Sequence, residues 1–266
     1  MSAVMKVTPT SAPLDLRGHL LVLPGAGGIA NLGELCVDAL ITTYGLQRVA
    51  IVETRHLLPV AMVCAFGEGP ITTAAELYQA PGVTLSVLQL RSGPVEGKRW
   101  ALAKELLHWA HSVGVDQVLL LASCSAHVKS DADLREASPL RQLGSVSGLL
   151  PLGHGEPDLG CAPGSAGAAR HLLRGSGLAR PLLEAAAEPQ SPSSFSPPSR
   201  VAPGVNCICG FTNEILDWRL PEQLVEAACQ YLAQCAVPQQ PLKRPLSWQL
   251  AQQAQIASPF DNAQLW

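Results

Sequence analysis

The chain has 266 residues and a mass of 28.0 kDa; 47% of the residues are hydrophobic and only 15% are charged, against the ~25% usual for a globular protein. The apolar content excludes a fully disordered chain. The net charge of −3 gives no electrostatic reason to expect nucleic acid or an anionic membrane as a partner. A folded protein of this length has a large surface, and so small a charged fraction needs an explanation.

The N-terminal part of the sequence indicates the compartment. Residues 1–17 are polar, and the first apolar run, 20–23, is too short for the core of a signal peptide. Every apolar run falls short of the ~18–20 residues that a membrane span needs. The eight cysteines are scattered through apolar segments, which favours reduced thiols packed as small hydrophobic groups. We therefore expect an intracellular protein without a membrane partner.

Strand-like and helix-like segments alternate between residues 18 and 143. Apolar positions at helical spacing predict two helices, each followed by a glycine suited to a helix end. The predicted strands are 19–23, 49–52, 60–66, 83–90 and 118–122, and the predicted helices are 30–44 and 98–113. This alternation predicts an α/β fold, a single layered domain with a mostly parallel sheet flanked by helices.

The second half of the chain has a different composition. Residues 144–204 are rich in Gly, Ala, Ser and Pro, and the last 17 of them hold five Ser and five Pro. Such a segment buries too little apolar surface to offset the entropy of ordering, so it predicts a disordered, flexible insertion. A strand at 205–211 and a helix at 221–235 are expected to follow, and residues 241–266 form a C-terminal tail. An adaptor that recruits a partner through the Pro/Ser segment is an alternative.

A glycine motif follows the first predicted strand. Gly25-Ala-Gly27-Gly-Ile-Ala30 fits G-x-G-x-x-A, and Glu53 closes the next strand. In a dinucleotide-binding enzyme Gly27 would allow close approach of the pyrophosphate, and Glu53 would bind a ribose. Pro24 and the late start of the helix favour a simple strand-to-helix turn and no cofactor. A dinucleotide- or nucleoside-binding enzyme using the Gly25–Ala30 loop remains the alternative.

Three other segments come close to catalytic motifs. Residues 93–99 have one residue too few between the glycines for a phosphate-binding loop, and Arg stands where Ser or Thr is needed. His108 and His111 lack the acidic residue of a helical zinc motif. Ser123 and Ser125 follow a strand without the G-x-S-x-G turn of a nucleophile. We predict no catalytic and no metal-binding residue, and hence no enzyme.

The chain resembles the proteasome assembly chaperone 2 family through segments in the same order and spacing. The matching segments are 18–24 (GHLLVLP), 31–42 (NLGELCVDALIT), 75–78 (AELY), 88–92 (LQLRS), 105–109 (ELLHW) and 118–125 (VLLLASCS). The resemblance implies a fold related to nucleoside phosphorylases without retained catalysis. It also implies a cytoplasmic and nuclear heterodimer with proteasome assembly chaperone 1, which binds 20S proteasome α-subunits and caps the face of the assembling α-ring.

The resemblance further implies a role for the C-terminal residues. In relatives, chaperone C-termini insert into pockets between α-subunits, so Gln264, Leu265 and Trp266 are the candidate partner-binding residues. Leu265 stands where the activator-type motif has Tyr. A chain that binds large partners needs extensive uncharged surface. We therefore attribute the low charge to surface covered by partners, and expect one face of the helix at 30–44 and a sheet edge to be covered in this way.

Overall fold

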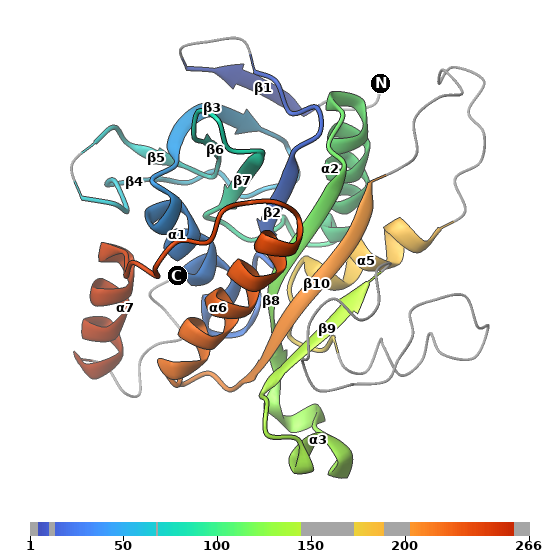
Figure 1. Ribbon diagram of the computed structural model, residues 1–266, viewed down its shortest axis with the longest axis vertical. Helices are drawn as coiled ribbons and strands as arrows, with labels where there is room; N and C mark the ends of the chain where they lie inside the picture. The colour runs from blue at the N-terminus through green and yellow to red at the C-terminus, as the bar shows by residue number, and fades with distance from the viewer. Residues whose placement is uncertain (1–4, 11–13, 68, 145–172, 189–202, 258–266) are drawn as a thin grey trace.

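The computed structural model describes residues 5–10, 14–67, 69–144, 173–188 and 203–257. Its centre is an eight-stranded sheet in the order β1-β3-β6-β7-β2-β8-β10-β9, with helices on both faces (Figure 1). The strands are β1 (Lys6–Pro9), β2 (Leu20–Pro24), β3 (Gln47–Glu53), β6 (Ala75–Gln79), β7 (Leu85–Leu90), β8 (Gln117–Ser125), β9 (Leu140–Gly144) and β10 (Gly204–Thr212). A separate two-stranded sheet pairs β4 (Ala61–Met62) with β5 (Thr72–Thr73).

The helices with a regular apolar face, α1, α2 and α6, lie where the sequence predicts them. The α-helices are α1 (Leu32–Tyr44), α2 (Arg99–Val113), α3 (Asp131–Arg135), α5 (Ala179–Ala187), α6 (Arg219–Gln234) and α7 (Leu246–Ala257); η1 (Ile29–Asn31) and η2 (Ala126–Val128) are 3-10 turns. α1 and α2 end at the predicted glycines, Gly45 and Gly114. Among the described residues, every helix is too short or too polar to cross a membrane.

The sheet is mixed. The central strands β7, β2, β8 and β10 pair in parallel, as predicted. The outer pairs β1–β3, β3–β6, β6–β7 and β9–β10 are antiparallel, so the prediction of a mostly parallel sheet is wrong at both edges. The tight turn at residues 80–84 allows only an antiparallel pair between β6 and β7, because a parallel pair needs a long crossover.

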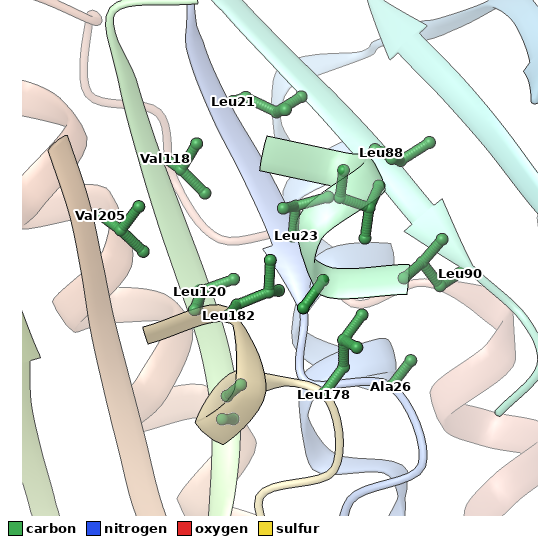
Figure 2. Packing of buried hydrophobic residues seen from close by; sticks show 14 of the residues in the cluster. Leu21, Leu23, Ala26, Leu88, Leu90, Val118, Leu120, Leu178, Leu182 and Val205 are labelled. Carbon is green, nitrogen blue, oxygen red and sulfur yellow. The ribbon is translucent and has the colours of Figure 1, made fainter. Parts of the chain in front are cut away.

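The core lies in two apolar layers, one on each face of the sheet. α1, α6 and α7 cover one face, and α2 and α5 cover the other (Figure 1). All five residues of β2 are buried, as expected for a strand covered on both sides. On the α5 face, Leu178 and Leu182 pack with Leu23 and Leu120 of the sheet (Figure 2). The seven cysteines of the described chain carry free thiols.

The predicted flexible insertion contains a packed segment. Residues 173–188 form a turn and α5, and Leu178, Ala179 and Leu182 are fully buried. For these residues the prediction is wrong, because the composition of the whole stretch concealed a short apolar stripe. The remainder, 145–172 and 189–202, lies outside the described residues.

Two further segments differ from expectation. The predicted strand at 60–66 has strand structure only at β4, and the residues after it form turns. The predicted tail begins with a docked helix, α7, whose Trp248 is buried and donates a hydrogen bond from Nε1 to the Leu35 carbonyl at 2.9 Å. That bond fastens α7 to α1.

Candidate functional site

The glycine loop, residues 25–31, joins β2 to α1 at the carboxyl end of the parallel strands. The Gly28 N–H donates to the Gly25 carbonyl at 3.0 Å, which closes a tight turn. The Gly27 N–H donates to Oε1 of Glu34 at 3.0 Å. In a dinucleotide site such backbone donors would face the pyrophosphate. Here they are satisfied within the loop and the first turn of α1.

A second segment, residues 173–178, lies against the glycine loop, and we call it the inner strap. The Ile29 N–H donates to the Gly175 carbonyl at 3.0 Å, and the Leu178 N–H donates to the Ala26 carbonyl at 3.0 Å. Loop and strap are therefore joined backbone to backbone, although about 150 residues separate them along the chain.

The two backbones approach each other closely at Gly177. A Cβ atom placed on Gly177 would lie 2.3 Å from the Ala26 carbonyl oxygen, 2.4 Å from that of Gly25 and 2.6 Å from the Gly28 nitrogen. The strap therefore packs directly against the backbone of the glycine loop. This packing and the internal hydrogen bonds of the loop do not favour the alternative of a nucleotide bound at the Gly25-Gly27-Ala30 loop.

The topology gives an independent reason. In a dinucleotide-binding unit the strand after the first helix lies beside the strand that precedes the glycines. Here β3 follows α1 but is separated from β2 by β6 and β7. Glu53, at the end of β3, forms an ion pair with Lys6 of the edge strand at 3.2 Å. It is therefore held at the far side of the sheet from the glycine loop.

The serines after β8 have structural roles. Ser123 is buried; its Oγ donates to the Gly175 carbonyl at 2.7 Å and accepts from the Ile29 N–H at 2.8 Å. Ser125 caps η2, because its Oγ accepts from the His127 N–H at 3.4 Å. The hydroxyl that sequence inspection raised as a possible nucleophile instead holds loop and strap together.

The histidines of α2 show no metal geometry. His108 and His111 lie on α2, and the described part of the chain contains no group of three or more His, Cys, Asp or Glu residues placed to hold a metal ion.

A buried charged network beside the glycine loop escaped sequence inspection. Arg91 donates from Nη2 to Oδ1 of Asp38 at 2.6 Å and from Nη1 to Oδ2 at 2.8 Å, and Gln89 Nε2 donates to the same carboxylate at 2.6 Å. Arg91 thereby neutralises Asp38. Two features of the sequence could have indicated this network. Asp38 is an acidic residue on the apolar face of α1, and Arg91 directly follows the buried strand β7.

Glu34 lies one helical turn before Asp38. Unlike Asp38, it forms no ion pair with an Arg or Lys among the described residues. The pKa of Glu34 is raised to about 7, mainly by burial and to a smaller extent by the charge of Asp38. The hydrogen bonds from the backbone N–H groups of Glu34 and Gly27 and the charge of Arg91 oppose this rise. Oε2 of Glu34 is buried without a hydrogen-bond partner among the described residues. The carboxyl group that holds the glycine loop is therefore half protonated near neutral pH.

A second network fastens the segment 58–73, which we call the arm and which contains β4 and β5. The Glu76 carboxylate accepts from Arg48 Nη1 at 2.6 Å, from the Tyr78 hydroxyl at 2.6 Å and from the Thr73 N–H at 3.0 Å. These bonds hold the base of the arm against β6 and leave its outer part projecting from the sheet (Figure 1).

The arm and α7 together carry exposed apolar side chains. Val63 and Ile71 of the arm are 83% and 65% exposed, and Leu246 and Leu250 of α7 are 38% and 50% exposed. A Cβ on Gly67, at the tip of the arm, would lie 3.9 Å from Cδ2 of Leu246, so the two segments adjoin. α7 has no charged residue in its twelve positions. With Leu58 of the arm, which is 49% exposed, the two segments hold five of the eight exposed large hydrophobic side chains among the described residues.

Neither the C-terminal residues nor the face of α1 is seen as an exposed partner surface in the described residues. Gln264, Leu265 and Trp266 lie outside the described residues. The face of α1 that was expected to meet a partner is covered by α6 and α7 of the same chain, and nine of its thirteen residues are buried. That expectation is wrong, because the low charge of α1 serves an internal contact.

Fold and site together define a three-layered α/β protein whose glycine loop is closed by its own strap. The chain belongs to the PAC2 family, whose model matches residues 22–188, from β2 through the strap to the end of α5.

Curated relatives of the chain are named more specifically than the family. Proteasome assembly chaperone 2 of Danio rerio is 31% identical over 148 residues, which cover 54% of this chain and 56% of that protein. Proteasome assembly chaperone 2 of Homo sapiens is 32% identical over 143 residues, covering 50% and 51%. The match thus spans about half the length of these relatives.

Solved structures share the fold. Pyrococcus furiosus PbaA, an archaeal homolog of proteasome-assembly chaperone, superposes with a TM-score of 0.61 at 13% identity, covering 97% of this chain and 96% of that one. Pyrococcus furiosus PbaB, an archaeal proteasome activator, gives 0.60 at 12% identity, covering 97% and 98%. At these sequence identities the similarity shows a shared fold alone.

Proposed function

We propose that the chain is a proteasome assembly chaperone subunit. It forms a heterodimer with proteasome assembly chaperone 1, and the heterodimer binds 20S proteasome α-subunits and caps the face of the α-ring during assembly, in the cytoplasm and the nucleus. The observation that carries the proposal is the PAC2 family match across residues 22–188, with relatives named proteasome assembly chaperone 2.

The closed glycine loop supports a role without catalysis. Its Gly27 and Gly28 backbone donors are bound internally, and the strap packs against the backbone of the loop. We propose that the fold is related to that of nucleoside phosphorylases and has lost its ligand site to the strap. Nucleotides at millimolar concentration are then expected to leave the melting temperature unchanged, whereas a ligand at 100 times its Kd stabilises by ~2.7 kcal/mol.

Co-expression with proteasome assembly chaperone 1 tests the heterodimer. Size-exclusion chromatography with light scattering should give one species with the summed mass of the two chains. Native gels should then show this species bound to purified 20S core particles. If the two chains elute separately and neither binds core particles, the proposal fails.

The C-terminal residues are proposed to provide an anchor for α-subunits. An aromatic residue with a terminal carboxylate can fill a pocket and meet a basic group inside it. Removing Gln264, Leu265 and Trp266 should weaken α-ring binding, while heterodimer formation and melting temperature are retained. Asn262→Ala, in the same segment, is the matched control. Unchanged affinity after the removal would exclude the anchor.

A further inference from the structure

We propose that Glu34 is a pH-operated latch on the joint between the glycine loop and the inner strap. Its neutral carboxyl holds the joint closed, and loss of the proton to water shifts the joint toward an open form in which the loop has moved away from the strap. The inference goes beyond the proposed function, because it concerns a device inside this chain and its test needs no partner protein.

The first support is the position of Glu34 between a fixed helix and a loop at the surface. α1 is fixed, because most of its residues are buried and Trp248 fastens it to α7. Oε1 of Glu34 accepts from the Gly27 N–H at 3.0 Å, and Gly27 itself is exposed. Movement of the glycine loop is therefore the shortest way for water to reach this carboxyl group.

The second support is the shortage of positive charge around Glu34. Among the described residues, the charged and titratable groups that interact with its carboxyl are Asp38 and Cys36 of α1 and Arg91 after β7. Both Nη groups of Arg91 are bound to Asp38, at 2.6 and 2.8 Å. Burial raises the pKa of the Cys36 thiol, which therefore stays neutral.

An ionised Glu34 thus lacks a counter-charge of its own in the closed joint. The glycine loop offers it the Gly27 N–H, and Oε2 is buried without a hydrogen-bond partner among the described residues. A buried charge without a partner is costly, so ionisation favours a form in which water reaches the carboxylate.

The third support is backbone strain where the glycine loop enters α1. Ala30 and Asn31 have φ angles of 55° and 48°, in the left-handed region. This conformation costs free energy for a residue with a side chain, and more for Ala than for Asn. Asn31 is the N-cap of α1, but its side chain makes no capping hydrogen bond. The closed loop is therefore held under strain by its bonds to Glu34 and the strap, and opening relieves that strain.

The direction of the pH effect follows from the number of protons bound in each form. The pKa of Glu34 is about 7 in the closed joint and 4.5 in water, so the closed form binds more protons between these values. Rising pH therefore favours opening. With Glu34 fully hydrated in the open form, the opening equilibrium should increase about 70-fold between pH 5 and pH 8.

Amide hydrogen exchange of the full chain tests the latch. The reporters are the Ile29 and Leu178 amides, which donate across the joint, and each rate is divided by the intrinsic rate at that pH. The reference is the Leu46 amide, which donates to the Ile41 carbonyl at 2.9 Å at the far end of α1. Urea below the unfolding transition accelerates exchange through global unfolding and leaves exchange through a small local opening almost unchanged.

Three variants separate the parts of the latch. Glu34→Gln keeps an acceptor for Gly27 but has no proton to lose. The matched control is Glu105→Gln on α2, because Glu105 also has one bonded oxygen, to the Thr54 hydroxyl, and one buried oxygen without a partner among the described residues. Ala30→Gly removes the strain and leaves every titratable group in place.

The expected result is that corrected exchange at Ile29 and Leu178 is about 70-fold faster at pH 8 than at pH 5, independently of urea, in the wild type and in Glu105→Gln. Glu34→Gln should abolish this pH dependence, and Ala30→Gly should slow opening about fivefold at each pH.

Three outcomes would overturn the inference. Exchange at Ile29 and Leu178 with the same urea dependence as at Leu46 would show that the joint opens only when the whole chain unfolds, and this comparison needs no variant. A pH dependence that persists in Glu34→Gln would assign the effect to another group. Faster opening in Ala30→Gly would show that the closed loop is not strained.

Discussion

The backbone of Gly177 lies against that of Ala26 so closely that a Cβ atom on the glycine would sit 2.3 Å from the alanine carbonyl oxygen. The two residues belong to the inner strap and the glycine loop, and the hydrogen bond from Leu178 to Ala26 follows directly after this contact. A motif that resembles a nucleotide site is in this way converted into an internal joint.

Gly177→Ala should destabilise the protein by more than about 3 kcal/mol, because the added methyl group meets fixed backbone and the residue has a φ of +57°. Chemical denaturation measures the loss. The control is Gly82→Ala, which has a similar φ of +75° but open space around the position. It should cost about 1 kcal/mol. Equal effects at the two positions would contradict a tightly closed joint.

Ser123→Ala should cost about 1–2 kcal/mol, because the buried hydroxyl bonds both Ile29 and Gly175. Ser112→Ala, on the exposed side of α2, removes a hydroxyl bond within one helix and should stay within about 0.5 kcal/mol of wild type. Hydrogen exchange at the Ile29 and Leu178 amides should accelerate only in the Ser123 variant. Unaltered exchange there would show that the hydroxyl does not secure the joint.

Glu34 should make stability depend on pH near neutrality. Burial raises its pKa from 4.5 to about 7, so the folded state binds more protons than the unfolded state between these values. Stability is therefore fully present below pH 4.5 and is lost as pH rises through 7, by about 3 kcal/mol.

Glu34→Gln removes this titration. The difference in unfolding free energy between variant and wild type should then change by about 3 kcal/mol between pH 4.5 and pH 8. Urea titrations at several pH values measure it. A difference that stays constant over the whole range would show that Glu34 does not titrate there.

Trp248→Ala should cost about 3–5 kcal/mol, because it removes a buried ring and the hydrogen bond that this ring donates to the Leu35 carbonyl. Trp100→Ala is the matched control, since that ring is 36% exposed on α2 and has the Lys104 ammonium 5.2 Å from its centroid. It should cost within about 1 kcal/mol. Similar losses at the two positions would argue against α7 as part of the folded core.

The central strands and the long helices could be predicted because their signals are local. β2 and β8 are continuous apolar runs, and α1 and α2 show helical spacing with a glycine at each end. β6 and β9 were missed because each buries a charged residue. Glu76 is neutralised by Arg48, and Arg141 by Asp133 at 2.8 Å, and these partners come from other elements. α7 was missed because its apolar residues are interrupted by glutamines and a single buried Trp fastens the helix to α1.

One of the two segments that form the candidate site, the glycine loop, could be predicted from the sequence, and the other, the inner strap, could not. The glycine motif is local and was found, but its occupant is a segment from the Gly-rich stretch that composition alone assigns to disorder. The contact between the arm and α7 likewise joins two segments that are distant in sequence. Short-range patterns carry no information about such pairings.

The inner strap also sets the point during synthesis at which the domain can close. The glycine loop leaves the ribosome roughly 10–30 s before Gly175 and Gly177 at the usual rates of elongation. Until then the side of β2 and β8 that α5 covers lacks this cover, and the loop lacks its hydrogen bonds to the strap. A PAC2-family chain of this design is thus a late folder, which needs residues up to β10 before its own sheet is sealed.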